Sequence, residues 1–217
     1  DSAGQTAGGT VSLTVRPPAA PPPQARNDAA TTNQGQPVTV GVLANDIDPL
    51  GRGLTVASVG VSPAGTATTD GQQVTFTPNG DFFGAATISY TVRDGANSAD
   101  RQSEAQIEVT VIGQPSMPGT PAAREGNATA TVNWSAPPSN GAPIDDYELR
   151  VDGGASVHTN AATAYTWNGL TNGVAVSFSV RAHNSAGWGP WSGSSPPVTP
   201  DIEPGRREKR HQQPFRE

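Results

Sequence analysis

The sequence contains no cysteine, so neither a disulfide nor a cysteine-ligated metal can hold the fold together. Each folded unit must therefore depend on its own apolar core. Lysine occurs once, at Lys209. Outside the last 17 residues the chain carries eight basic and fifteen acidic side chains, a net charge of −7. A body of that charge repels a phosphate backbone, which argues against a nucleic-acid partner.

Long apolar runs and helical periodicity are also missing. The sequence has no run of 18 apolar residues and no charged-then-apolar leader, so it predicts no direct insertion into a membrane. What it has instead is 25 glycines and 21 prolines among 217 residues. Glycine and proline at this frequency are typical of many short strands joined by tight turns.

Short segments in which apolar and polar residues alternate indicate the fold class. Between residues 37 and 111 they read PVTVGVL, LTVASVGV, GTATT, QVTFTP, ATISYTV and AQIEVTV. Later come ATATVNW, DDYELRV and VAVSFSVRAH, which predict Val174, Val176 and Phe178 inside and Arg150 and Arg181 outside. Six or seven strands in under about 90 residues fit one β-sandwich. We therefore predict an all-β chain of two consecutive antiparallel Ig-like β-sandwiches joined by a short proline-containing linker.

The same patterns divide the chain into five segments. Residues 1–15 end in GTVSLTV, which alternates like AQIEVTV, and are predicted to be the last strand of a preceding repeat. The alternative is a native N-terminal strand that pairs within the first sandwich. Residues 16–25 form a proline-rich linker, 26–113 the first domain, 114–200 the second and 201–217 a disordered charged tail.

The second domain is similar to a known family. Its segments VNWSAPPSNGAPIDDYELRV, AYTWNGLTNG and FSVRAHNSAGWGPWS resemble a fibronectin type III domain. The resemblance implies that Trp134, Tyr147 and Leu170 pack together in the core. Val176 stands where the family usually has a tyrosine, so the hydrogen bond of that tyrosine's hydroxyl is expected to be missing.

The first domain carries VLANDIDPLGRGLTV near its start and TFTPNGDFFGAATISYTVRDG near its end. These motifs resemble the bacterial Ig-like, cadherin-like tandem repeats of large surface proteins, in which an acidic loop sometimes holds calcium. Here only Asp46 and Asp48 remain, while Leu50 and Arg52 occupy positions that are often acidic. Calcium needs six to eight oxygen ligands. The sequence therefore favours the alternative, in which Asn45 and Asp46 make turn hydrogen bonds to local backbone.

The segment GWGPWS is the strongest candidate for a site. Trp188 and Trp191, followed by Ser192, are similar to the tryptophan–serine box of cytokine-receptor modules. That resemblance implies a cation–π stack with Arg181, the one candidate partner, and hence a short stack. The alternative is that Trp188, Trp191 and Trp167 are exposed and stack on sugar rings.

No catalytic, cofactor-binding or metal-ligating residues are predicted. The histidines are His158, His183 and His211, and none has the sequence setting of a catalytic base beside a nucleophile. The paired acids at 145–146 and 46–48 are expected to be solvated turn residues rather than a general acid and base. The sequence therefore predicts a protein segment that is not an enzyme.

The function expected from these observations is that of a non-catalytic structural spacer or adhesion segment. It would belong to a large secreted or cell-surface bacterial protein, stay monomeric within that longer chain and meet a protein or polysaccharide partner. The alternative is a polysaccharide- or protein-binding accessory module of a multidomain secreted hydrolase.

Overall fold

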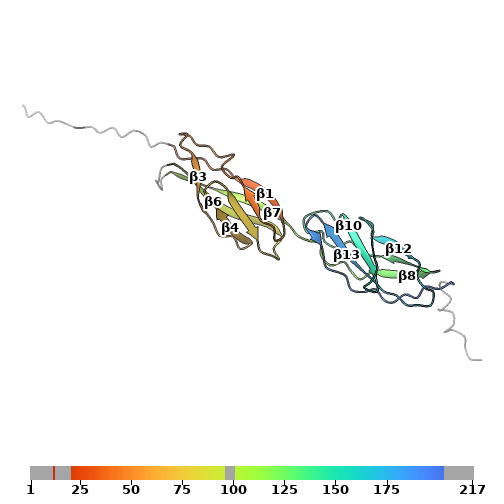
Figure 1. Cartoon of the computed structure of the whole chain (residues 1–217). Helices are drawn as coiled ribbons and strands as arrows, with labels where there is room; N and C mark the ends of the chain where they lie inside the picture. Colours follow the sequence, from red (N-terminus) through yellow and green to blue (C-terminus); the bar gives the residue numbers. More distant parts are fainter. Residues whose placement is uncertain (1–11, 13–20, 96–100, 203–217) are drawn as a thin grey trace, which may run out of the picture.

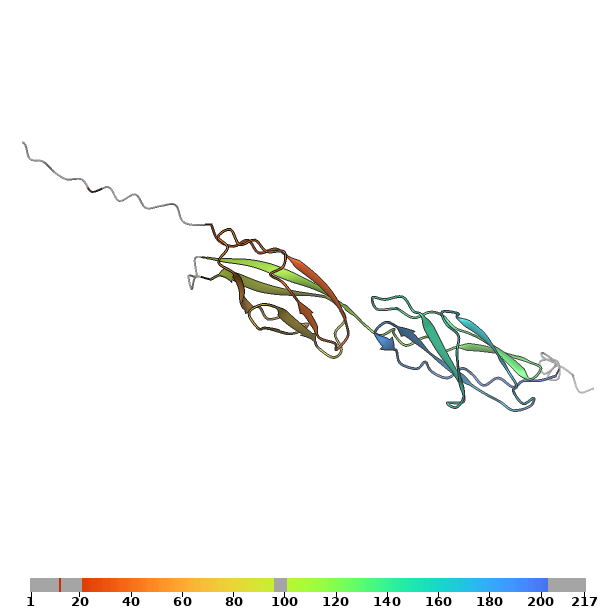
Figure 2. The ribbon, with the colours of Figure 1, turned by 45° about the horizontal axis from the view of Figure 1, so that its top comes forward.

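The computed structural model describes residues 12, 21–95 and 101–202, which contain fourteen strands and no helix. None of these residues forms a helix with the length and apolarity needed to cross a bilayer. The predicted N-terminal strand and nearly all of the predicted tail fall outside the described residues. The strands build two β-sandwiches that lie end to end (Figures 1 and 2), as the alternation predicted.

The first sandwich has one sheet of order β1-β7-β6-β3 and another of order β2-β5-β4. Its strands are β1 (Asp28–Asn33), β2 (Val38–Val40), β3 (Leu54–Val59), β4 (Gly65–Thr69), β5 (Val74–Pro78), β6 (Gly84–Asp94) and β7 (Gln102–Ile112). The inward residues of β5, β6 and β7 make most of its core, and the largest are Phe76, Ile88, Tyr90 and Ile107. Val61 was grouped with the apolar positions of the second segment, yet it lies beyond the end of β3 and is fully exposed.

Strand β1 pairs with β7 in parallel, with Asp28 opposite Ile107 and Asn33 opposite Ile112. This pair differs from the antiparallel arrangement expected throughout. Its sequence, DAATTN, is small and polar, so the alternation that revealed the other strands is weak here. Because β1 and β7 run in the same direction, the chain comes into this sandwich at one end and leaves it at the other (Figure 1).

The second sandwich has sheets of order β11-β10-β13-β14 and β12-β9-β8. Its strands are β8 (Ala122–Gly126), β9 (Thr129–Asn133), β10 (Asp146–Val151), β11 (Ser156–His158), β12 (Ala164–Asn168), β13 (Phe178–Asn184) and β14 (Gly187–Trp188). In the core, Trp134 and Tyr147 meet edge to face with ring centroids 5.6 Å apart, and Leu170 packs against the same cluster.

The predicted inward run of valines before β13 is only partly correct. Val176 is buried, so it fills the slot where a tyrosine was expected. Val174 is instead 51% exposed, because its N–H donates to the carbonyl of Thr171 in a turn that precedes the strand. The alternation in the sequence therefore starts two residues before the buried positions do.

Candidate functional site

The outer face of the β11-β10-β13-β14 sheet carries a stack of aromatic rings and guanidinium groups. The guanidinium carbon of Arg181 lies 4.8 Å from the ring centroid of Trp188 and 4.6 Å from that of Trp191. That of Arg150 lies 3.9 Å from the centroid of Trp191. At the other end, the ring of His183 is 4.8 Å from that of Trp188. We call these five residues the tryptophan–arginine ladder, and it is longer than the short stack expected from Arg181 alone.

The backbone beside β13 explains how both tryptophans reach this face. The N–H groups of Gly189, Ser192, Ser195 and Val198 donate to the carbonyls of Ala182, Val180, Phe178 and Val176, respectively. From Gly189 to Val198, every third residue therefore bonds every second residue along β13 and the two residues before it. Trp188, Trp191 and Ser194 each stand one position earlier in this repeat. All three therefore contact successive outward side chains of β13.

A carboxylate balances the charge at the centre of the ladder. Arg181 Nε donates a 2.7 Å hydrogen bond to Glu148, which lies directly opposite on β10. Burial acts to raise the pKa of Glu148, but hydrogen bonds from Ser156 and Arg181 outweigh it, so the pKa lies below its ordinary value. Glu148 therefore stays ionised and fixes the plane of the guanidinium between the two indoles.

Two histidine–aspartate pairs flank the same ladder. Nδ1 of His158 lies 2.6 Å from Asp146 Oδ2, and Nδ1 of His183 lies 2.7 Å from Asp145 Oδ1. Both imidazoles also approach the ring of Trp188. Within the described ranges, no hydrogen bond joins either imidazole to a serine or threonine hydroxyl, as a nucleophile and its base would require. These pairs orient rings around Trp188.

The tryptophans do not form a flat exposed platform. Both Trp188 and Trp191 are half-buried: Trp191 lies between Arg150 and Arg181, and Trp188 contacts Arg181 and His183. Trp167 points inward, with its ring 5.8 Å from that of Phe178 and 6.1 Å from that of Tyr165. A sugar ring needs an open aromatic face, so this geometry favours the stacked interpretation over sugar stacking on the three tryptophans.

The acidic loop of the first sandwich is occupied by backbone contacts. Asp46 Oδ1 accepts a 2.8 Å hydrogen bond from the N–H of Arg26, and Asn45 donates one of 3.1 Å to the carbonyl of Asn27. Both bonds tie down the approach to β1, whereas local turn bonds were expected from these two residues. Asp48 makes the turn bonds, because it accepts two N–H groups from the following five residues. No cluster of three or more acidic or histidine side chains in the described chain is placed to hold a metal ion.

Hydrogen bonds hold the linker GQPSMPGTP, residues 113–121, which connects the two sandwiches. The N–H of Gly113 donates to the carbonyl of Asn140 at 2.8 Å. The Asn140 side chain donates in turn to the carbonyl of Gln114 at 2.7 Å and to Ser116 Oγ at 3.2 Å. The N–H of Ser116 donates to the carbonyl of Pro138 at 2.9 Å. The first linker residues are therefore bound along a loop of the second sandwich.

Asn184, the last residue of β13, lies fully buried at this junction. Its amide nitrogen donates to the carbonyls of Gly113 at 2.8 Å and Ser139 at 2.7 Å, and its oxygen accepts the N–H of Ala186 at 2.8 Å. A buried amide whose donors and acceptor are all used fixes the backbone around it. Asn184 therefore joins the end of β7 to two loops of the second sandwich.

Two further contacts close the junction. Asn33 at the end of β1 donates a 2.8 Å hydrogen bond to the carbonyl of Ser185, directly between the sandwiches. The linker also passes so close to Gly189 that a Cβ there would lie 2.2 Å from the carbonyl oxygen of Pro115. Glycine is required at this position because no other residue leaves room for the linker backbone.

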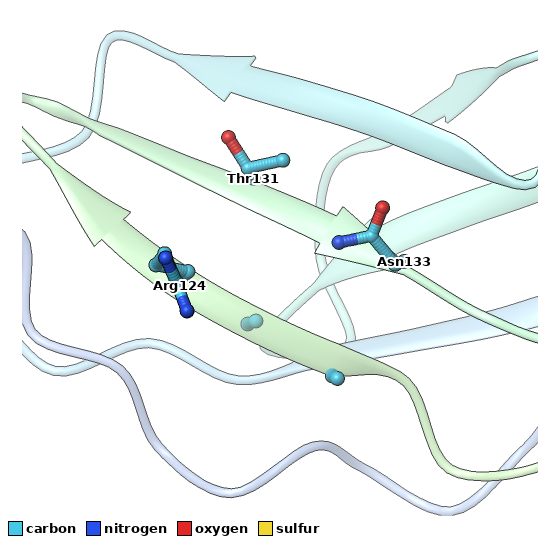
Figure 3. Close-up of a pocket in the computed structure, with 5 residues that line it drawn as sticks. Arg124, Thr131 and Asn133 are labelled. Carbon is cyan, nitrogen blue, oxygen red and sulfur yellow. The ribbon is translucent and has the colours of Figure 1, made fainter.

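The opposite sheet of the second sandwich has a hollow of about 500 Å³ over β8 and β9. Figure 3 shows that Arg124 comes from β8, while Thr131 and Asn133 come from β9. Ala122 and Ala123 complete the lining. This hollow has no counterpart among the sites expected from the sequence.

Comparison with known domains identifies both sandwiches. The family model of the bacterial Ig domain matches residues 20–112, and that of the fibronectin type III domain matches residues 114–198. The chain is therefore a bacterial Ig domain followed by a fibronectin type III domain. Both resemblances drawn from the sequence motifs are confirmed, and both domains are non-catalytic modules.

Two curated relatives of the chain are chitinases. Chitinase C of Streptomyces lividans is 33% identical over 152 residues, which cover 61% of this chain and 24% of the chitinase. Chitinase 63 of Streptomyces plicatus is 32% identical over 152 residues, covering 61% of this chain and 25% of that enzyme. The matched region thus spans about a quarter of each relative.

A solved structure supports the fold alone. Titin domains A168 to A170 superpose with a TM-score of 0.51 at 14% identity, over 80% of this chain and 62% of that structure. This likeness supports the all-β fold of the described chain.

Proposed function

We propose that the chain is a non-catalytic spacer within a multidomain bacterial polysaccharide hydrolase that acts outside the cell. The junction between the Ig and fibronectin type III domains carries this proposal. Asn184 and Asn140 bind the linker backbone, and Asn33 bonds the next domain directly. Domains joined by a short flexible linker would tumble separately, whereas bonds along the linker restrict bending.

The chain direction supports the same role. The parallel pairing of β1 with β7 makes the chain cross the Ig domain from end to end, and the two domains continue in one line (Figure 2). A spacer needs this property, because the lengths of successive domains add up only when each domain begins where the previous one ends. The tryptophan–arginine ladder stabilises the fibronectin type III domain, which has no disulfide to do so.

The relatives favour the hydrolase context. Both chitinases share about a quarter of their length with this chain, and neither matched domain is a catalytic module. A spacer role would also suit an adhesion protein of the cell surface, but the chitinases favour an enzyme that works on an insoluble polymer. The polymer is then the partner of the whole protein, and the spacer sets the reach of its catalytic domain.

Electron–electron distance measurements test the rigid spacer directly. Because the sequence has no cysteine, Thr68→Cys and Thr166→Cys supply one spin label on an exposed strand of each domain. We expect one narrow distance distribution, as narrow as that of a control pair within the Ig domain, Thr68→Cys with Thr87→Cys. A broad distribution between the domains would contradict the proposal.

The non-catalytic half of the proposal has its own test. The purified chain is incubated with soluble chito-oligosaccharides, and the products are followed by chromatography. We expect the oligosaccharides to remain intact. Any hydrolysis that persists in repurified protein would show that the chain is catalytic.

A further inference from the structure

The hollow over β8 and β9 results from the alternation of side-chain size on one sheet face. Across β8, β9 and β12, one outward row reads Ala122, Asn133 and Ala164. The neighbouring row carries larger side chains, Arg124, Thr131 and Thr166. The small side chains of the two alanines leave space beside Asn133, and the side chains of the next row border this space. The hollow is therefore a consequence of the strand register.

Among the described residues, the polar side chains of this hollow make a single hydrogen bond. In the described ranges, neither Arg124 nor the side chain of Asn133 makes a hydrogen bond or ion pair, and both residues are exposed. Thr131 Oγ1 lies 3.4 Å from Thr166 Oγ1 in the adjacent row. A guanidinium, an amide and two hydroxyls therefore face solvent with their hydrogen-bonding capacity largely unused.

The charge and size of the hollow restrict its ligand. Its lining has one cation and no carboxylate, which disfavours a cationic ligand. Its volume of about 500 Å³ lies within the range of small-molecule sites, roughly 300 to 1,000 Å³. The methyl group of Ala122 offers apolar contact between the polar groups, whereas the side chain of Ala123 packs against the core on the other face of the sheet. This mixture suits a ligand with C–H faces, hydroxyls and neutral amides.

We propose that the hollow binds N-acetylglucosamine units of a chitin chain, a proposal that rests on the proposed hydrolase context. The amide of Asn133 can donate to the carbonyl of an acetamido group and accept from its N–H. Arg124 donates to acetamido or hydroxyl oxygens, and Thr131 exchanges hydrogen bonds with hydroxyls. The ladder lies on the opposite sheet, so binding here leaves the fold of the domain undisturbed.

The test is a two-dimensional NMR titration of the whole isotope-labelled chain with the soluble hexamer of N-acetylglucosamine. We expect weak binding with a Kd of about 1 mM, because the hollow is shallow and has no aromatic wall. Shifts should concentrate at residues 122–124 and 131–133. Arg124→Ala and Asn133→Ala should each weaken binding about tenfold, whereas Asn168→Ala, an exposed residue two rows away on the same sheet, should leave it unchanged.

Each other outcome overturns the proposed site. No shifts at saturating oligosaccharide would exclude a chitin site, and shifts confined to the indoles of Trp188 and Trp191 would move recognition to the ladder. A titration with an oligogalacturonate is the charged comparison. Binding of that acid in preference to the hexamer would mean that Arg124 recognises an anionic polymer. The spin-label distance does not depend on any of these results, so a silent titration with a narrow distance rejects the site and leaves the spacer standing.

Discussion

Arg181 is the residue on which the ladder depends, because its guanidinium contacts both Trp188 and Trp191 and is held by Glu148. Arg181→Ala should lower the free energy of unfolding of the fibronectin type III domain by about 1 to 2 kcal/mol, since two partly desolvated cation–π contacts are lost. Urea denaturation followed by tryptophan fluorescence measures this, as all four tryptophans lie in that domain. Arg124→Ala, the change of a partnerless exposed arginine, should stay within about 0.5 kcal/mol. Equal losses for the two variants would contradict the ladder's contribution.

In the Ig domain, the buried side chain of Tyr90 makes hydrogen bonds through its hydroxyl group. Its hydroxyl lies 2.7 Å from the carbonyl of Arg26 and 2.9 Å from Asp28 Oδ2, and its ring is buried. Burial, and then the hydrogen bond to Asp28, raise the pKa of Tyr90 far above the ordinary value of 10.0.

A pH-dependent stability follows from this shift. An unfolded tyrosine ionises near pH 10 while the folded one keeps its proton, so stability is intact below about pH 10 and falls above it. Tyr90→Phe should cost about 1 kcal/mol at neutral pH and reduce the loss between about pH 10 and pH 11. Thermal unfolding of the Ig domain followed by NMR measures both. A variant with the parent's alkaline slope would show that another group causes it.

At this scale the sequence reveals residue types but not their partners. The resemblance of GWGPWS to the tryptophan–serine box implied the contact of Arg181 with Trp188 and Trp191 at the centre of the ladder. Arg150 was expected to face outward, yet nothing in the sequence aligns it with Trp191. That contact depends on the register of β10 against β13 and on the unusual backbone that follows β14. His183 was missed for the same reason.

At the scale of elements, the segment after β14 holds its place through side chains as well as backbone. Ser192 Oγ accepts the N–H of Val180, and Ser195 Oγ accepts that of Phe178, both at 3.0 Å. Each serine thus supplies the acceptor that a regular strand would supply from its carbonyl. The sequence WSGSS shows no alternation, so periodicity could not predict an element here.

Removing either hydroxyl should therefore destabilise the domain. Ser192→Ala and Ser195→Ala should each cost about 1 to 2 kcal/mol, because both serines are buried and a strand N–H is left without a partner. Ser194→Ala is the matched control, since Ser194 is exposed and its hydroxyl lies 3.3 Å from that of Ser179 instead of accepting a strand N–H. Urea denaturation by tryptophan fluorescence again gives the values. A loss for Ser194→Ala as large as for its neighbours would refute the role of the two buried hydroxyls.

Strand β1 is one of the short strands that sequence reasoning missed, as it missed β8, β11 and β14, and the omission of β1 affected the expected architecture. Alternation detects strands with one apolar face, and DAATTN offers mainly alanine and threonine to the core. Its parallel pairing with β7 depends on contacts about 80 residues apart in sequence, such as the N–H of Ala25 with Ser103 Oγ. Local patterns contain no information on such pairings. The proline-containing linker between the sandwiches could be identified by composition, but its bonds to the fibronectin type III domain could not.

At the scale of the whole molecule, Asn184 decides whether two stable domains also form one stiff unit. Its side chain bonds Gly113 at the end of the Ig domain and Ser139 in the next domain. Asn184→Ala should lower the free energy of unfolding of the fibronectin type III domain by about 2 kcal/mol, because buried carbonyls lose their donors. It should also broaden the distance distribution between labels at Thr68→Cys and Thr166→Cys, since the linker is released from β13.

A destabilised domain could broaden that distribution without any change at the junction, so the control must weaken the same domain elsewhere. Asn172 accepts the N–H of Ala128 at 2.8 Å and donates to Asn127 at 2.9 Å. These contacts lie at the turn between β8 and β9, at the end of β8 that is farther from the linker. Asn172→Ala should therefore lower stability and leave the distance distribution narrow. If both variants broaden it equally, stiffness comes from domain stability and not from Asn184. If neither does, the remaining bonds hold the junction without Asn184, because Asn140 still bonds the linker at Gln114 and Asn33 still bonds Ser185 of the next domain.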